Sequence, residues 1–107
     1  RYSASLKDDF VIPDVPEGFV SSWAQYTLRG RGAASRDKYF EKLKLCEVPS
    51  AVYYGKSLHR QKAFESKCIH SGLSLSEYAE CEVFSLPMHP YLSENDQQFV
   101  VDSLLAL

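Results

Sequence analysis

Two prolines that stand three residues apart, Pro87 and Pro90, constrain this chain more than any other local feature. Proline fixes its own φ at about −65° and disfavours helix at the residue before it, so the segment around them must be extended or turned. Met88 and His89 lie between the prolines, and we expect them, with Tyr91, to pack this turn against the body of the domain. The motif therefore predicts a rigid and mainly structural approach to a final helix.

Three amphipathic helices are predicted from N-cap residues that are followed by apolar residues at helical spacing. Ser93 and Asp96 match the spacing of a capping box, as do Ser74 and Glu77. Pro49 marks the exit from the first of the three helices. The expected N-caps with their apolar stripes are Ser35 with Tyr39, Phe40 and Leu43, Ser74 with Tyr78, Ala79 and Val83, and Ser93 with Val100, Leu104 and Leu107.

Alternating apolar residues predict two short strands, over residues 19–29 and 50–54. Residues 1–10 read as the end of a helix that begins upstream, residues 11–18 as an extended linker, and residues 55–72 as a loop with helical turns. We therefore expect an α+β fold in which a small sheet of two or three strands is covered by helices. On the first strand the two predicted faces are Val20, Ala24, Tyr26 and Leu28, and Trp23, Gln25 and Thr27.

Composition excludes several classes of function. The 107 residues carry a net charge of −2, with a pI of about 5.9, so we expect neither nucleic acid nor a membrane surface as a partner. No apolar run approaches the roughly 20 residues that span a bilayer. Cys46, Cys68 and Cys81 form no C-x-x-C pair, which predicts reduced thiols in a cytoplasmic protein. Because the first residue is Arg1, we expect the chain to be part of a longer protein.

Local motifs for catalysis or metal binding are weak. The spacing of His59, Cys68 and His70 matches no zinc pattern. The basic turn Arg29–Gly32 lacks the third glycine of a dinucleotide fingerprint. No G-x-S-x-G, H-E-x-x-H or Walker motif is present, although a lone cysteine–histidine nucleophile pair stays open. From its residues alone, the chain is predicted to be a small α+β domain.

Three strings in order are far more specific. They are SSWAQYTLR (21–29), VPSAVYYGKSLHRQ (48–61) and SLPMHPYLSENDQQFVVDSLLAL (85–107). Together they resemble the C-terminal small domain of the DegT/StrS family of pyridoxal-phosphate (PLP) sugar aminotransferases, across essentially the whole chain. The resemblance implies a fold-type I aminotransferase, with residues 1–18 as the interdomain helix end and linker and residues 19–107 as the small domain.

The resemblance also implies a reaction. A lysine of the large domain holds PLP, an amino donor that is usually glutamate delivers its amino group, and a keto group on a nucleotide-linked sugar receives it. The product serves polysaccharide or O-antigen assembly, and the strings are most similar to members that act on UDP-linked sugars. The full-length protein would be a cytoplasmic homodimer. This fragment alone should be inactive, because the family's lysine motif is not among its strings; its own lysines are Lys7, Lys38, Lys42, Lys44, Lys56, Lys62 and Lys67.

Substrate-binding residues follow from the same resemblance. Tyr53 and Tyr54 match an aromatic or histidine pair, and His59 matches a loop histidine. The stretch that carries them approaches the active site, partly that of the neighbouring subunit. Phenol and imidazole groups hydrogen-bond sugar hydroxyls, carboxylates and phosphates. Neighbouring strand residues face opposite ways, so we expect one tyrosine, Tyr54, to reach the site and Tyr53 to leave the other face. His89 is a minor site candidate.

Three positions depart from the family pattern. Members often read YYPKPLH, and here the two prolines are replaced by Gly55 and Ser57, which predicts a more mobile loop. Where the family usually has glycine after the first full helix, this chain has Glu47. A residue just past a helix end commonly adopts a left-handed conformation, which a side chain disfavours by about 1 kcal/mol.

Two other functions stay open. A non-catalytic homologue could bind PLP or sugar as a regulator, and a free-standing domain could bind a ligand without any large domain. The sequence upstream of Arg1 distinguishes the three, because only the enzyme requires a large domain that keeps its lysine.

Overall fold

The fold is built on a three-stranded antiparallel sheet. The structure is a computed structural model that describes residues 1–31 and 36–106. Its strands are β1 (Phe10–Val11), β2 (Tyr26–Gly30) and β3 (Val83–Leu86), and their order in the sheet follows the chain. Tyr26 pairs with Leu86 and Arg29 with Val83, so β2 is the central strand. Sheet and helices together confirm the predicted α+β class.

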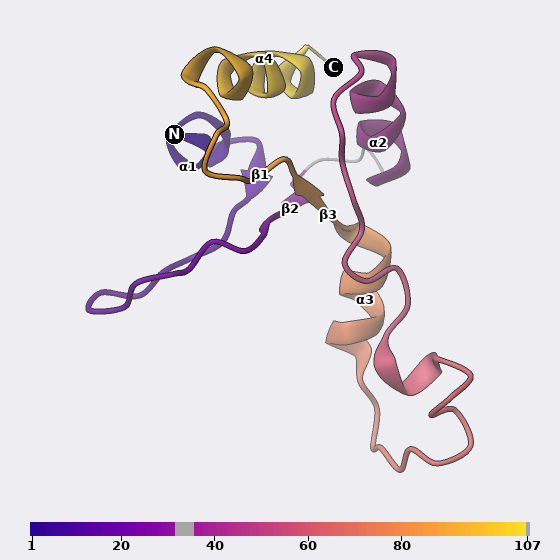
Figure 1. Cartoon of the computed structure of the whole chain (residues 1–107). Helices are drawn as coiled ribbons and strands as arrows, with labels where there is room; N and C mark the ends of the chain where they lie inside the picture. Colours follow the sequence, from indigo (N-terminus) through magenta and orange to yellow (C-terminus); the bar gives the residue numbers. More distant parts are fainter. Residues whose placement is uncertain (32–35, 107) are drawn as a thin grey trace.

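Helices cover one face of this sheet (Figure 1). They are α1 (Tyr2–Leu6), α2 (Arg36–Leu45) and α4 (Glu94–Leu105), and α4 packs against both of the others. A fourth helix, α3 (Ser74–Glu82), lies away from them beside a 3-10 helix at Leu58–Arg60. Within residues 1–31 and 36–106, no helix has the length and apolar character needed to cross a membrane.

The hydrophobic core lies between the sheet and the three covering helices. On β2 and β3 every second side chain faces inward, so Leu28 and Phe84 are almost completely buried. Phe10, Tyr39 and Phe84 form an aromatic cluster with ring centroids 5.0 to 6.1 Å apart. The buried apolar residues are Tyr2, Leu6, Phe10, Tyr26, Leu28, Tyr39, Leu43, Val48, Phe84, Leu86, Val100, Val101 and Leu104.

The predicted strands are partly wrong. The strand expected over residues 19–29 begins only at Tyr26, because Trp23 has a φ of 49° that interrupts extended pairing. Residues 50–54 form no strand, since only Ala51 bridges to Ser85. Two strands form where we expected none. β1 lies across residues 1–10 and the linker, and β3 begins at Val83, which we expected to be helical.

Of the two predicted capping boxes, one is confirmed and the other is wrong. In α4 the Ser93 hydroxyl accepts a hydrogen bond from the Asp96 N–H at 3.1 Å, and the Asp96 carboxylate accepts one from the Ser93 N–H, which confirms the predicted capping box. In α3 the predicted box is wrong, because Leu73 is the N-cap and makes no side-chain cap. The predicted N-cap Ser35 and the last stripe residue, Leu107, fall outside the described residues.

The proline turn is only partly packed. Met88 contacts the core as predicted, whereas His89 is exposed and Tyr91 is 90% exposed, so the packing predicted for these two is wrong. The Tyr2 hydroxyl donates a hydrogen bond to the Pro87 carbonyl oxygen at 3.2 Å. The turn is therefore held to α1 through its backbone.

Candidate functional site

The predicted site residues lie on the segment that leaves the sheet after the Ala51–Ser85 bridge. This segment passes through the 3-10 helix at Leu58–Arg60 and returns along α3, and together they form an arm that projects from the sheet and its covering helices (Figure 1). The loop prediction for residues 55–72 is confirmed, with helical turns at the 3-10 helix and after it. The site is therefore built by a loop that packs on a single helix.

Tyr53 and Tyr54 lie together at the start of this arm. Their rings meet edge to face with centroids 5.9 Å apart. Tyr54 is 73% exposed and Tyr53 is 46% exposed. The expectation that the two side chains leave opposite faces of a strand is wrong, because residues 52–54 are not in a strand. The two exposed rings thus lie side by side at the start of the arm.

Both tyrosines line a hollow between the loop and α3. Its volume is about 800 Å³, and its surface is mostly apolar. Pockets of this size hold small-molecule ligands when a few polar groups are present to orient them. Besides the two tyrosines, the residues that line it are Lys56, Ser57, Leu58, His59, Gln61, Phe64, Cys68, Leu73, Ser76, Ala79, Glu80 and Val83.

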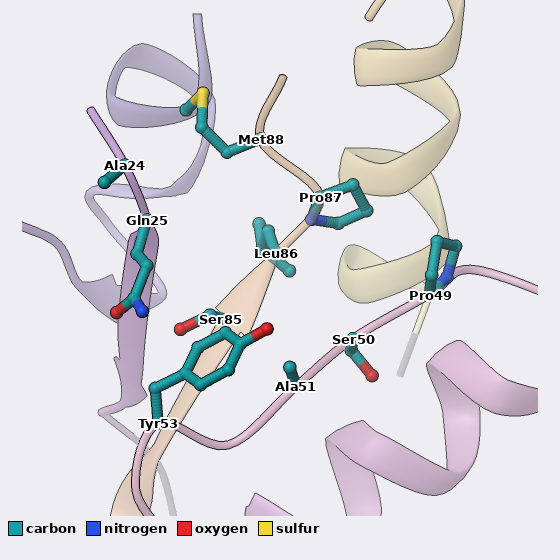
Figure 2. Close-up of a pocket in the computed structure, with 10 residues that line it drawn as sticks. All are labelled: Ala24, Gln25, Pro49, Ser50, Ala51, Tyr53, Ser85, Leu86, Pro87 and Met88. Atoms are coloured by element: carbon teal, nitrogen blue, oxygen red, sulfur yellow. The ribbon is translucent and has the colours of Figure 1, made fainter. Parts of the chain in front are cut away.

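A smaller cavity of about 210 Å³ opens on the face of the sheet away from the core. Figure 2 shows its lining side chains, which include Gln25, Tyr53 and Ser85. The Ser85 and Thr27 hydroxyls share a hydrogen bond at 2.8 Å on this face. Tyr53 lines both hollows, so the two are neighbours across one phenol ring.

His59 is held within the arm. Its side chain is 5% exposed, and Nε2 lies 3.0 Å from a carboxylate oxygen of Glu77. The ring also packs edge to face on His70, with the centroids 4.6 Å apart. The predicted contact between His59 and the substrate therefore stays a prediction, and the observed contacts fit a residue that orients the loop.

Glu80 is a site residue that sequence reasoning missed. Its carboxylate accepts hydrogen bonds from the Ser57 N–H and from Arg60 Nη1, the latter at 2.6 Å. The nearby Ser57 hydroxyl and N–H, followed by the Arg60 charge, lower the pKa of Glu80 from its ordinary value. Of the two Ser57 groups, only the N–H is hydrogen-bonded to Glu80, and the buried Ser57 hydroxyl has no hydrogen-bond partner among the described residues. The one signal in the sequence was the spacing of Glu77 and Glu80, which places them on one face of a helix.

His89 and the basic turn, two other candidates from the sequence, do not join the site. His89 lies on the turn before α4 and is not among the residues that line either hollow. In the predicted basic turn, Arg29 lies over the Tyr78 ring at 5.2 Å, and Arg31 donates to the Phe10 carbonyl oxygen. Gly32 falls outside the described residues. Both arginines have structural partners within the chain.

A PLP site is not formed by the described residues alone. A Schiff-base lysine must stand in a pocket with donors for the phosphate and a partner for the pyridine nitrogen. Lys42 is half-buried and the other lysines are exposed. Lys56 lines the larger hollow, but its neighbours there are chiefly apolar. The residues present do not fit the whole cofactor.

Comparison with known proteins gives a consistent result. The model of the DegT/DnrJ/EryC1/StrS aminotransferase family matches residues 1–105. A crystal structure of a DegT/DnrJ/EryC1/StrS aminotransferase from Brucella abortus superposes with a TM-score of 0.90 at 38% sequence identity, over 98% of this chain and 28% of that one.

Two further relatives have different names. A pleiotropic regulatory protein from Geobacillus stearothermophilus is 38% identical over 94% of this chain and 26% of its own length. A UDP-2-acetamido-2-deoxy-3-oxo-D-glucuronate aminotransferase from Pseudomonas aeruginosa is 36% identical over 86% of this chain and 24% of its own length. The chain therefore spans about a quarter of the proteins that it matches.

Proposed function

Because the chain belongs to the DegT/DnrJ/EryC1/StrS aminotransferase family, we propose that the full-length protein is a PLP-dependent sugar aminotransferase. It transfers an amino group from glutamate to a keto group of a nucleotide-linked sugar, for polysaccharide or related sugar synthesis. The observation that carries this proposal is the family match over residues 1–105, to which the UDP-sugar relative adds the substrate class. The lysine that binds PLP is proposed to lie in the remaining part of the protein.

Within that protein, we propose that residues 1–18 link the two domains and that residues 19–107 form the small domain. The exposed Tyr54, with Tyr53 beside it, offers hydroxyl groups to the sugar nucleotide at the rim of an apolar hollow. His59 orients the loop through Glu77. In a cytoplasmic homodimer this arm would face the active site of the neighbouring subunit.

A regulator is the second candidate. The name of the Geobacillus stearothermophilus relative favours it, because that protein is called a pleiotropic regulatory protein and is as similar to this chain as the crystal structure from Brucella abortus. A regulator of this family would keep the fold and the ligand hollow without turnover. The first experiment must therefore separate binding from catalysis.

The experiment is an assay of the full-length protein, loaded with PLP, against glutamate and a panel of UDP-linked keto sugars. Mass spectrometry of the product reports amination, and absorbance reports the glutamate half-reaction. We expect amination of at least one keto sugar of the panel. Cofactor binding without amination of any panel member contradicts the enzyme and supports the regulator.

Tyr54→Phe tests the part that this chain plays. The variant removes one exposed hydroxyl, and the loss of a neutral hydrogen bond of about 0.5–1.5 kcal/mol predicts a roughly two- to tenfold fall in kcat/KM for the sugar. The fall should appear as a higher KM, while the glutamate half-reaction is unchanged. Tyr91→Phe is the matched control, since Tyr91 is 90% exposed on the turn before α4. Wild-type kcat/KM in Tyr54→Phe would contradict the assignment.

A further inference from the structure

One carboxylate holds both ends of the 3-10 helix in the arm. The side chain of Glu80 is 10% exposed, and its two oxygens have different partners. One oxygen accepts from the N–H of Ser57, just before the 3-10 helix, and the other accepts from the side chain of Arg60, its last residue, at 2.6 Å. A charged acceptor makes stronger hydrogen bonds than a neutral one, so this contact fixes the turn against α3.

The backbone of the same residue extends the connection to the core. The Glu80 carbonyl oxygen accepts a hydrogen bond from Arg36 Nη1 at 2.6 Å. Arg36 begins α2, which packs against α4 and β3. Glu80 therefore links the loop, α3 and the covering helices, and Glu77 adds its contact with His59 from the same face of α3.

Few hydrogen bonds hold the tyrosine pair in place in the part of the chain that the structure describes. Among the described residues, no backbone–backbone hydrogen bond involves residues 52–56, and the Lys56 carbonyl oxygen accepts a hydrogen bond from the Gln61 side chain at 3.3 Å. The segment is fixed before them by the Ala51–Ser85 bridge and after them by the Ser57 contact with Glu80. Tyr54 lies between these two points, so its position depends on both of them.

We propose that Glu80 is a positioning residue of the transamination site, which holds the Tyr53–Tyr54 pair at the rim of the hollow without touching the substrate. The inference rests on the proposed function, since it requires Tyr54 to contact the sugar nucleotide. Its consequence is that loss of the Glu80 contact weakens sugar binding and leaves the half-reaction with glutamate intact.

Glu80→Gln in the full-length, PLP-loaded protein tests this role. The amide keeps one acceptor oxygen and turns an NH₂ group toward one of the two donors, so one end of the turn loses its partner. We expect the KM for the keto-sugar nucleotide to rise roughly three- to tenfold with kcat little changed.

The control is Glu82→Gln, on the same helix, because Glu82 makes no ion pair or side-chain hydrogen bond with any residue that the structure describes. Arg60→Gln removes the other partner of the same contact at an exposed position, so it keeps the test valid if Glu80→Gln misfolds. It should raise the KM for the keto-sugar nucleotide in the same way.

Hydrogen exchange gives a readout that needs no turnover. Exchange in peptides covering residues 53–61 should become faster in Glu80→Gln and stay unchanged in Glu82→Gln. Faster exchange with an unchanged sugar KM would overturn the positioning role, and unchanged exchange would overturn the contact itself. If the wild type aminates no sugar, the proposed function fails and the role in transamination falls with it, while the exchange result still shows whether Glu80 holds the loop.

Discussion

Glu47 has a φ of 57° and closes α2. The Val48 N–H bonds the Leu43 carbonyl oxygen at 2.8 Å, and the Glu47 N–H bonds that of Lys44 at 3.1 Å, which is the Schellman pattern. Val48 and Leu43 are both buried, as the motif's apolar contact requires. The left-handed conformation expected from the family's glycine is therefore confirmed at this residue.

Glu47→Gly should raise the free energy of unfolding by up to about 1 kcal/mol. Glycine adopts a positive φ without the steric penalty of a side chain, and its larger entropy in the unfolded chain offsets part of the gain. Denaturant unfolding measures the change. Trp23→Gly is an instructive control, because Trp23 also has a positive φ but packs on Tyr26, so that variant should lose stability. A destabilised Glu47→Gly would show that the Glu47 side chain makes a contact that the fold needs.

At the scale of elements, the two serines with similar sequence signals have different roles. Ser93 caps α4 and is bonded to Asp96, while Ser74 is the first residue of α3 and its predicted partner Glu77 binds His59 instead. In a capping box, the N-cap N–H needs the acidic side chain as its acceptor, so another donor nearby can take that side chain away. The nearly buried imidazole of His59 is such a partner, and it is 18 residues away in the chain.

Ser93→Ala should lower the free energy of unfolding by about 0.5–2 kcal/mol, since the Asp96 N–H in the first turn of α4 loses the Ser93 hydroxyl as its acceptor. Ser74→Ala should change it by no more than a few tenths of a kcal/mol, because the exposed Ser74 makes no cap and alanine favours helix. Thermal or denaturant unfolding of the two variants side by side checks the contrast. Equal losses would mean that α3 is capped by Ser74 after all.

Local patterns predicted the helices better than the strands. The stripes of α2 and α4 are long enough to show their period, and the alternation at Tyr26 and Leu28 was correct. β1 has two residues and β3 has four, and both form because β2 lies beside them. The role of Glu80 likewise depends on a contact across 23 residues, from Ser57 to Glu80, which no local pattern encodes.

The whole molecule is extended for its length. Its radius of gyration is 15.4 Å, compared with about 13 Å for a compact domain of this size. Two arms account for the excess, one formed by the segment between β1 and β2 and the other by the loop and α3 (Figure 1). The first carries the exposed apolar residues Phe19 and Val20, and the second carries Tyr54. The core itself reaches back to Tyr2, so the first helix and strand pack with the body of the predicted small domain.

The alkaline pH dependence of folding tests how tightly Tyr2 is held in that core. Burial, followed by the neighbouring Tyr26, raises the pKa of Tyr2 to about 12, whereas an unfolded tyrosine ionises at about pH 10. A raised folded-state pKa gives a contribution to stability that is fully present below about pH 10 and is lost as the pH rises through about 12. Tyr2→Phe should therefore flatten the fall in unfolding free energy over that window, although it lowers stability at neutral pH by removing the hydrogen bond to Pro87.

Denaturant unfolding from neutral pH to about pH 12 measures both effects. The control is Tyr91→Phe, at a 90% exposed position, which should follow the wild-type curve. An unchanged slope in Tyr2→Phe would show that the Tyr2 phenol is open to solvent and that α1 does not pack as the core requires.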